Sequence, residues 1–313
     1  MEYTRLGRTE LQASVMGLGC GGHSRLGQAT GRTEKESVAI VQQALDYGVN
    51  FIDTAESYGT EPIVGKALAG VPRDAYILST KKSLREDDQW ITAAQLKAGL
   101  ERSLKTLNTD YVDIYHLHGL LPDQYDYACS ELVPALESLK EQGKIRFSGV
   151  TEMFGRDPQH AMLSRATQDP YWDVIMVGFN ILNQSARQHV FPHTKANDIG
   201  VLIMFAVRRA LRSRENFAEM VAYLHEQQLL DPATQSLAAV EAVFGTAGGA
   251  ASMQDAAYRF CRYEDGVHVT LSGTGNPDHL AANHESLLRP PLPAATTTAL
   301  KDMFGHIDSV SGN

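Results

Sequence analysis

The sequence has few cysteines, no long apolar run and no excess of positive charge, and each of these features argues against a particular class of protein. The three cysteines, Cys20, Cys129 and Cys261, are widely spread and lack the spacing of metal ligands, which fits a reducing compartment. No apolar run is long enough to span a bilayer, and the charged start MEYTRLGRTE has no apolar signal core. A net charge of -9 argues against nucleic acid or an anionic membrane surface as a partner. We therefore expect a cytoplasmic protein.

Short apolar stretches alternate regularly with helical patterns along the 313 residues. The predicted strands span residues 15–19, 49–53, 76–80, 111–117, 145–150, 173–177, 200–205 and 267–272. Helical patterns fit at 33–47, 61–69, 92–107, 129–142, 157–168, 185–197 and within 214–263. Strict alternation predicts parallel strands, and eight such strands close a barrel. No linker rich in Pro, Gly or Ser divides the chain, so we expect a single domain over residues 1–313.

Three segments exceed the minimal barrel. Residues 2–12 are predicted to form a hairpin that turns at Gly7-Arg8-Thr9, and residues 290–313 a Pro-rich turn, a helix and a tail. Residues 207–266 make an over-long connection between the seventh and eighth strands. The predicted fold class is therefore α/β, a (β/α)8 TIM barrel with an N-terminal hairpin and an enlarged connection at a position where loops tend to carry specificity.

Four polar residues stand where successive predicted strands end. Asp53 and Tyr58 follow the second strand, Lys81 the third and His118 the fourth. The carboxyl ends of parallel strands form the mouth where ligands bind, so we expect these side chains to meet there. A Lys81 ammonium beside the phenol is expected to lower the pKa of Tyr58 from about 10. Asp53 is expected to orient Lys81, and His118 to orient a carbonyl or tune the phenol, which indicates general acid–base catalysis at a carbonyl oxygen.

The sequence resembles the aldo-keto reductases. The resemblance runs through the stretches YTRLGRTEL, MGLGCGG, GVNFIDTAESYG, ILSTK, YVDIYHLHG, GKIRFSGVTE and SGTGNPDHLAAN. It covers nearly the whole chain apart from residues 207–266 and the tail. It implies an oxidoreductase of the EC 1.1.1 type that moves hydride between NAD(P)H and a small carbonyl or sugar substrate. Asp53, Tyr58, Lys81 and His118 match the family's catalytic positions, with Tyr58 as the general acid/base.

The resemblance also implies where the nicotinamide lies. The family holds the nicotinamide amide with a Ser-Asn pair after the fifth strand and a Gln on the sixth, where this chain has Thr151-Glu152 and Met176. Thr151 can replace serine and Glu152 can accept from the amide, whereas Met176 cannot replace an amide group. Phe205 or Phe179 is expected to supply the ring that stacks on nicotinamide.

The phosphate and adenosine contacts implied by the resemblance are partly altered. The seventh strand, which usually ends in Tyr-Ser-Pro-Leu-Gly, ends here in Met204-Phe205-Ala206-Val207-Arg208, where Arg208 either meets the pyrophosphate or is a surface arginine. Many relatives bind the 2′-phosphate with a lysine and an arginine, and Gly273 and His279 stand at those positions. The absence of these cations slightly favours NAD as the cofactor, with NADP as the alternative. The expected cofactor contacts are Gly19, Cys20, Thr151, Glu152, Phe179, Phe205, Ala206, Val207, Arg208, Gly273, Thr274, Gly275, Asn276, His279 and Asn283.

Two alternatives and one misleading motif accompany this interpretation. Residues 17–22 fit the letters of GxGxxG, but no helix opens on the last glycine, so these glycines are interpreted as letting the backbone approach a ligand. The altered amide contacts favour a non-catalytic, cofactor-sensing barrel as one alternative. His116 and His118 share one face of a strand, so a metal-dependent hydrolase that adds Asp53 and Lys81 is a further alternative, although a hydrogen-bonded core histidine is the preferred interpretation of His116.

Overall fold

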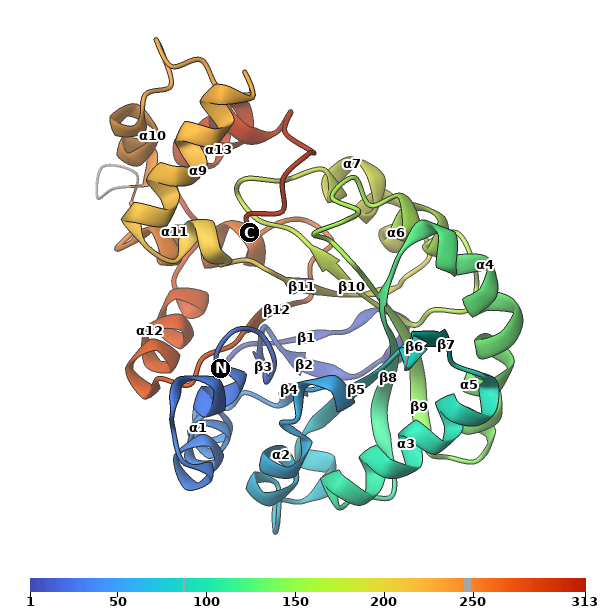
Figure 1. Cartoon of the computed structure of the whole chain (residues 1–313). Helices are drawn as coiled ribbons and strands as arrows, with labels where there is room; N and C mark the ends of the chain where they lie inside the picture. The colour runs from blue at the N-terminus through green and yellow to red at the C-terminus, as the bar shows by residue number, and fades with distance from the viewer. Residues whose placement is uncertain (87, 245–248) are drawn as a thin grey trace.

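The computed structural model describes residues 1–86, 88–244 and 249–313, and its centre is a closed barrel of eight parallel strands (Figure 1). In chain order the strands are β3 (Met16–Gly19), β4 (Phe51–Asp53), β5 (Ile77–Ser83), β8 (Val112–Leu120), β9 (Ile145–Glu152), β10 (Val174–Gly178), β11 (Gly200–Met204) and β12 (Val269–Ser272). Each strand pairs with the next one in this order, and β12 pairs with β3 to close the ring. The predicted (β/α)8 barrel is confirmed.

Helices cover the outside of the barrel (Figure 1). They are α1 (Glu34–Asp46), α2 (Glu61–Ala67), α3 (Ala93–Leu107), α4 (Tyr125–Tyr127), α5 (Val133–Glu141), α6 (Ala161–Ala166), α7 (Ala186–His189), α8 (Phe191–Ala196), α11 (Met253–Arg262) and α12 (Pro277–Leu288). A capping box begins α1, because Thr33 accepts from the Glu36 backbone and Glu36 accepts from the Thr33 backbone.

Side chains alternate between the interior of the barrel and the layer beneath the helices. The interior cluster includes Phe51, Ile77, Ile114, Val174, Met176, Leu202 and Val269, and three residues of the N-terminal hairpin, Leu6, Leu11 and Ala13, join it. The outward-facing residues of the same strands, such as Ile175 and Val177, belong to the larger cluster between strands and helices. This alternation decides which side chains can reach the mouth.

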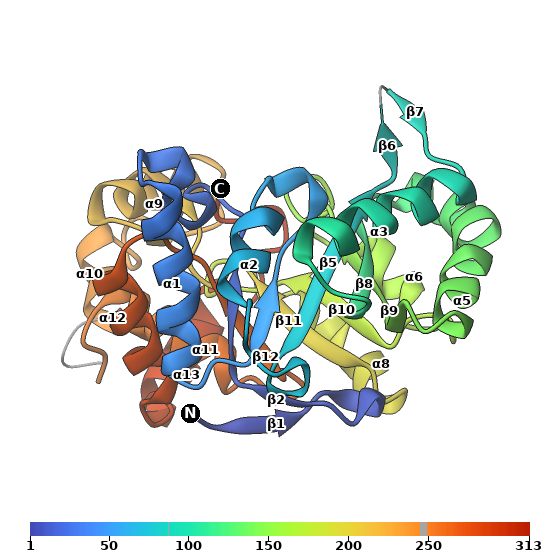
Figure 2. The same ribbon diagram turned by 90° about the horizontal axis from the view of Figure 1, so that it is seen from below.

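The predicted N-terminal hairpin covers the end of the barrel where the strands begin (Figure 2). It consists of β1 (Tyr3–Arg5), a 3-10 turn over Gly7–Thr9 and β2 (Gln12–Ser14). At Gly7, which has a φ of 50°, a Cβ atom would lie 2.4 Å from the Gly200 nitrogen, so only glycine permits this close approach.

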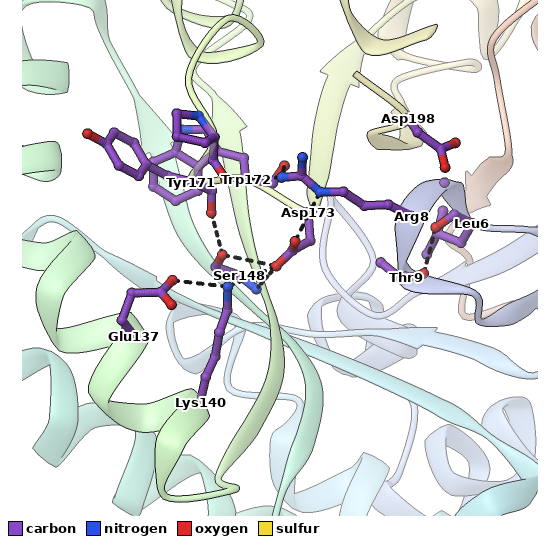
Figure 3. Close-up of polar contacts among 12 residues, drawn as sticks. Leu6, Arg8, Thr9, Glu137, Lys140, Ser148, Tyr171, Trp172, Asp173 and Asp198 are labelled. Atoms are coloured by element: carbon purple, nitrogen blue, oxygen red, sulfur yellow. Dashed lines mark hydrogen bonds and ion pairs between the residues drawn. The ribbon is translucent and has the colours of Figure 1, made fainter. Parts of the chain in front are cut away.

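A polar network fastens this hairpin to the barrel (Figure 3). Arg8 Nε donates to Asp173 Oδ1 over 3.2 Å, and Arg8 Nη2 donates to the Trp172 carbonyl over 2.7 Å. The other oxygen of Asp173 accepts from the Ser148 backbone over 3.0 Å and pairs with Lys140 over 3.0 Å. Because these contacts lie at the N-terminal end of the strands, we interpret them as stabilising the fold.

The enlarged connection after β11 is helical. It contains a 3-10 turn over Arg209–Leu211, α9 (Arg214–Glu226), α10 (Leu237–Phe244) and α11, and with α13 (Ala294–Phe304) the helices α9 and α10 form a lobe beside the ring (Figure 1). The pattern within 214–263 therefore contains three helices in its described part, and residues 245–248 of it lie outside the described residues. None of the helices in the described ranges is long and apolar enough to cross a membrane.

A second hairpin was not predicted. It consists of β6 (Arg85–Glu86) and β7 (Gln89–Trp90), and it projects at the end opposite to β1 and β2 (Figure 2). The sequence here is LREDDQW, whose charged residues give no apolar alternation from which strands can be predicted.

Candidate active site

A buried ion pair lies at the mouth, where β4 ends beside β5. Lys81 Nζ donates to Asp53 Oδ2 over 2.6 Å and to the Thr54 carbonyl over 2.7 Å. Ser79 Oγ donates to the other carboxylate oxygen, Asp53 Oδ1, over 2.8 Å. Burial is the largest single effect and opposes the charge of Lys81, but the charge and hydrogen bond of Asp53, together with smaller contributions from Tyr58 and Cys20, raise the pKa of Lys81. Lys81 is therefore a fixed positive charge at the mouth.

Tyr58 and His118 lie next to this pair. Tyr58 ends the 3-10 turn Glu56–Tyr58 that follows β4, and its hydroxyl is 3.3 Å from Nε2 of His118 on β8. The two rings meet edge to face with centroids 5.4 Å apart, and Lys81 Nζ lies 5.1 Å from the centroid of the Tyr58 ring. A Cβ atom at Gly21 would lie 2.4 Å from Tyr58 Cε2, so this glycine lets the loop after β3 pack against the phenol. The structure thus brings together all four predicted catalytic residues.

The pKa of the Tyr58 phenol is shifted in the direction opposite to the one expected from the sequence. Burial raises the pKa of Tyr58, and the opposing effect of the Lys81 charge is smaller. The expected lowering by Lys81 is therefore present, but desolvation outweighs it. Burial and the same lysine lower the pKa of His118 to about 3, so His118 is neutral at pH 7. The pair is a protonated phenol facing a neutral imidazole.

His116 points to the same interior face as His118, one layer deeper. It is fully buried, and among the described residues neither ring nitrogen has a hydrogen-bond partner, so the expected hydrogen bond is not found. Burial, Lys81 and His118 lower the pKa of His116 well below its ordinary value. A Cβ atom at Gly149 would lie 2.2 Å from His116 Nδ1, so this glycine makes room for the ring. No three His, Cys, Asp or Glu side chains of the described ranges are arranged as metal ligands.

The positions expected to hold the nicotinamide amide are engaged within the protein. Glu152 Oε2 and Oε1 lie 2.9 and 3.0 Å from His160 Nδ1, and Oε1 also accepts from the Gly178 backbone over 2.8 Å. The Glu152 side chain is 0% exposed. Thr151 Oγ1 accepts from the Gly119 backbone over 2.7 Å. The structure therefore does not direct Glu152 at an amide of the cofactor, contrary to the expectation from sequence.

The two candidate stacking rings lie in different places. Phe179 follows the outward-facing Val177 of β10 and is fully buried against Phe191 and Phe260, with ring centroids 5.3 and 5.8 Å away. It faces the helix layer and does not reach the mouth. Phe205 follows β11, is only partly buried, and adopts a left-handed φ of 69° that is uncommon for a bulky residue. Phe205 is the stacking candidate that remains.

The expected adenosine-phosphate loop follows β12 at the mouth. A Cβ atom at Gly273 would lie 2.7 Å from the carbonyl oxygen of Gly19, so these two loops approach closely. Asn276 caps α12 by accepting from the Asp278 backbone over 2.9 Å, and Thr274 accepts from the Asn276 backbone over 3.0 Å. Of the other expected contacts, Cys20, Ala206 and Gly275 are buried, Val207, Arg208 and Asn283 are partly buried, and His279 is exposed.

Three contributors to this region were missed. Ser79 supports Asp53, His160 engages Glu152, and Asn313 contacts Arg208. Of the three, only Ser79 could be predicted from the sequence, because it precedes Lys81 by two residues and so lies on the same face of the strand. His160 and Asn313 reach the site through loops, which carry no periodic signal.

Two cavities lie away from this chemistry. Their volumes are about 290 and 270 Å³, and both are lined by Arg73, Tyr76 and Tyr111 near the N-terminal ends of β5 and β8. We place the site at the opposite end because the four chemically matched side chains converge there and because ligands of parallel barrels bind where the strands end.

Comparisons with known proteins agree with this geometry. The model of the Aldo/keto reductase family matches residues 17–303. L-galactose dehydrogenase from Arabidopsis thaliana is 33% identical over 208 residues, which cover 64% of this chain and 64% of that protein. Aldo-keto reductase YhdN from Bacillus subtilis (strain 168) is 34% identical over 224 residues, covering 67% of this chain and 63% of YhdN. The chain thus spans just under two thirds of the length of these curated relatives.

Solved structures show the same similarity over more of the chain. The holo form of aldo-keto reductase AKR11C1 from Bacillus halodurans has a TM-score of 0.77 and 26% identity, and the match covers 97% of this chain and 96% of that one. A thermostable aldo-keto reductase, Tm1743, solved with the inhibitor epalrestat, has a TM-score of 0.69 and 25% identity, covering 97% of this chain and all (100%) of that one.

Proposed function

The chain belongs to the aldo/keto reductase family, whose members use NAD(P)H, and from that premise we propose that it reduces the carbonyl group of an aldehyde, ketone or aldose, or oxidises the corresponding alcohol. One observation carries the proposal: Tyr58, Lys81 and His118 converge at the C-terminal ends of adjacent strands, with the phenol 3.3 Å from the imidazole. That geometry provides a proton donor and a polar environment for a carbonyl oxygen.

The mouth offers residues that fit a dinucleotide. The partly buried Phe205 ring, which follows β11, is our candidate for stacking on a nicotinamide, and the close approach of Gly19 and Gly273 leaves backbone surface without side chains. The N-terminus of α12, capped by Asn276, is favourable for an adenosine phosphate. When bound, the nicotinamide supplies the hydride that adds to the carbonyl carbon.

The protein's own residues handle the proton. The Tyr58 hydroxyl donates its proton to the carbonyl oxygen as charge develops there. The positive charge of Lys81, fixed by Asp53, stabilises the phenolate that remains. Neutral His118 hydrogen-bonds to the phenol or to the carbonyl oxygen through Nε2, which orients the carbonyl toward the acid. In the oxidative direction the same phenolate accepts the proton of the alcohol.

We favour NAD over NADP as the cofactor. His279, at the position where relatives have a cation, is exposed on the first turn of α12, and Asp278 stands beside it. A carboxylate in this turn opposes a second phosphate group, because both carry negative charge. No fixed guanidinium or ammonium lies within residues 273–283.

A cofactor-binding barrel without turnover is the second candidate, and one observation favours it. Glu152 is engaged by His160 and Gly178, so the nicotinamide amide loses an anchor that the family normally provides. Loss of orientation at the reacting ring reduces turnover more than it reduces binding.

The test combines binding with turnover. NADH and NADPH are titrated against the protein by fluorescence, and reduction of benzaldehyde and of an aldose is followed with each cofactor. Saturable binding with turnover supports the reductase, and saturable binding without turnover of any carbonyl compound supports the second candidate. Failure to bind either dinucleotide contradicts both.

A further inference from the structure

Arg208 is a partly buried cation at the mouth of the barrel. It follows β11 by a few residues, and its guanidinium carbon lies 3.9 Å from the centroid of the Phe205 ring, which covers one face of the group. Its Nε donates to Asn313 Oδ1 over 2.6 Å. The guanidinium is therefore held in one orientation from two sides.

The guanidinium has no anionic partner in the described part of the chain. Arg208 forms no ion pair there, and its only side-chain hydrogen bond goes to the neutral amide of Asn313, which leaves both terminal nitrogens available. Its neighbour Arg209 differs, because it is 69% exposed and pairs with Glu219 at 3.6 Å. Removing a cation partly from water costs free energy when no negative charge lies beside it. A bound anionic ligand would supply that negative charge and offset the cost.

The position of Arg208 relates it to the reacting centre. Arg208 stands in the loop after β11, at the same end of the barrel as Tyr58, which follows β4. Burial lowers the pKa of Arg208. With Nε occupied, the two terminal nitrogens present a planar fork of the kind that binds both oxygens of a carboxylate.

We propose that Arg208, oriented by Phe205 and Asn313, binds a carboxylate of the substrate, so that the preferred substrate is an aldehyde or ketone that carries a carboxylate, and not a neutral aldose. This inference rests on the proposed function. A second source of the same chemistry is the pyrophosphate of the dinucleotide, and the experiment separates the two.

The kinetic experiment compares matched aldehydes. We measure kcat/KM for succinic semialdehyde and butanal, and for 4-carboxybenzaldehyde and 4-methylbenzaldehyde, at saturating NADH. The unmodified protein is expected to favour the carboxylated member of each pair by about tenfold to a hundredfold, the range of one charge-assisted contact. Arg208→Gln should reduce this ratio to about one, mainly through KM of the carboxylated aldehyde, and Arg208→Lys should retain part of it. Arg209→Gln is the matched control and should keep the full ratio.

A second variant tests the role of Asn313. Asn313→Asp places a carboxylate against Arg208 Nε and satisfies its charge internally, so the preference for carboxylated aldehydes should disappear without loss of the arginine. Asn313→Ala should weaken the preference less, because it removes a restraint and adds no charge.

Binding measurements keep the inference testable if no aldehyde is turned over. Calorimetric titration with 4-methylbenzoate, with 4-methylbenzyl alcohol as the neutral comparison, should show saturable binding of the carboxylate to the unmodified protein and to Arg209→Gln, and at least tenfold weaker binding to Arg208→Gln. Saturable carboxylate binding without turnover supports the anion site and contradicts the proposed reductase.

Three results would overturn the inference. One is equal efficiency for carboxylated and neutral aldehydes in the unmodified protein. Another is carboxylate binding that Arg208→Gln leaves unchanged. The third is a weaker fluorescence titration with NADH in Arg208→Gln, together with equal slowing of both aldehydes, which assigns Arg208 to the pyrophosphate.

Discussion

Asp53 and Lys81 form an ion pair of 2.6 Å at the barrel mouth, and neither side chain exposes more than 4% of its surface. The remaining oxygen of Asp53 accepts from Ser79, and the ammonium also donates to the Thr54 carbonyl, so both charges are hydrogen-bonded. The attraction between buried charges largely offsets their desolvation as long as both are present. Removing either one leaves the other uncompensated, so the pair links stability to the proposed catalysis.

We expect Lys81→Met to lower the free energy of unfolding by about 3–5 kcal/mol, because it leaves Asp53 as an unpaired buried carboxylate. The measurement is urea unfolding at pH 7. The matched control is Lys82→Met, whose partner Glu56 is 27% exposed, so water can solvate that carboxylate and the loss should be smaller. Adding Asp53→Asn to Lys81→Met should recover part of the loss. Equal stability of Lys81→Met and the unmodified protein would show that the pair is not formed as described.

Replacing His116 should make stability less sensitive to acid. In the folded protein the pKa of His116 lies well below its ordinary value, so below about pH 6.5 the unfolded chain binds a proton that the folded chain does not. The neutral His116 side chain therefore makes its full contribution to the free energy of unfolding above pH 6.5, and that contribution is lost as the pH falls. Between pH 7 and 5, His116→Leu should lose about 2 kcal/mol less free energy of unfolding than the unmodified protein.

The control for this prediction is His23→Leu, since His23 is exposed. That variant should keep the acid sensitivity of the unmodified protein. An identical pH dependence for His116→Leu would mean that the buried imidazole has a partner that keeps its proton affinity near normal.

Cofactor preference should be weak. The 2′-phosphate of NADPH needs a cation that residues 273–283 do not fix, and one charge-assisted contact contributes about 1.5–3 kcal/mol. We therefore expect kcat/KM with NADPH to exceed that with NADH by at most about tenfold. His279→Arg should shift the ratio toward NADPH, and His306→Arg, a change on a histidine outside the adenosine-phosphate loop, should not.

A hundredfold preference of the unmodified protein for NADPH would contradict this expectation. The missing charge would then have to come from another segment. Arg25 is the first residue to test, because the loop that contains it packs against the adenosine-phosphate loop where Gly27 meets Gly275.

The barrel and the four residues Asp53, Tyr58, Lys81 and His118 were predictable because both produce patterns over short stretches of sequence. Buried parallel strands are continuous apolar runs, and the polar residues that end such runs share one edge of the barrel. Phe179 was misplaced because a single residue of register decides whether a side chain faces the mouth or the helices. The direction of the pKa shift of Tyr58 depends on the balance of burial against one charge, which no spacing reveals.

Contacts between distant segments explain the rest. Glu152 was expected to face a ligand, but its partner His160 stands eight residues later, in a left-handed conformation that local propensity disfavours. Arg208 meets Asn313 across 105 residues, because the tail returns to the mouth. The Asn183 side chain donates a hydrogen bond of 2.8 Å to the Val310 carbonyl, which helps to hold the C-terminal segment against the barrel. A single sequence gives no pattern from which such a contact can be predicted.

The central claim is that the Tyr58 hydroxyl donates the proton to the carbonyl oxygen, and Tyr58→Phe tests it most directly. The substitution removes one oxygen atom and keeps the ring that packs against Gly21. The measurement is kcat for reduction of an aldehyde that the unmodified protein turns over, together with the fluorescence titration of NADH. We predict that kcat falls by about 10²–10⁴-fold while the dissociation constant of NADH changes little. A kcat within about twofold of the unmodified protein would remove Tyr58 from the mechanism and contradict the proposed role of the site.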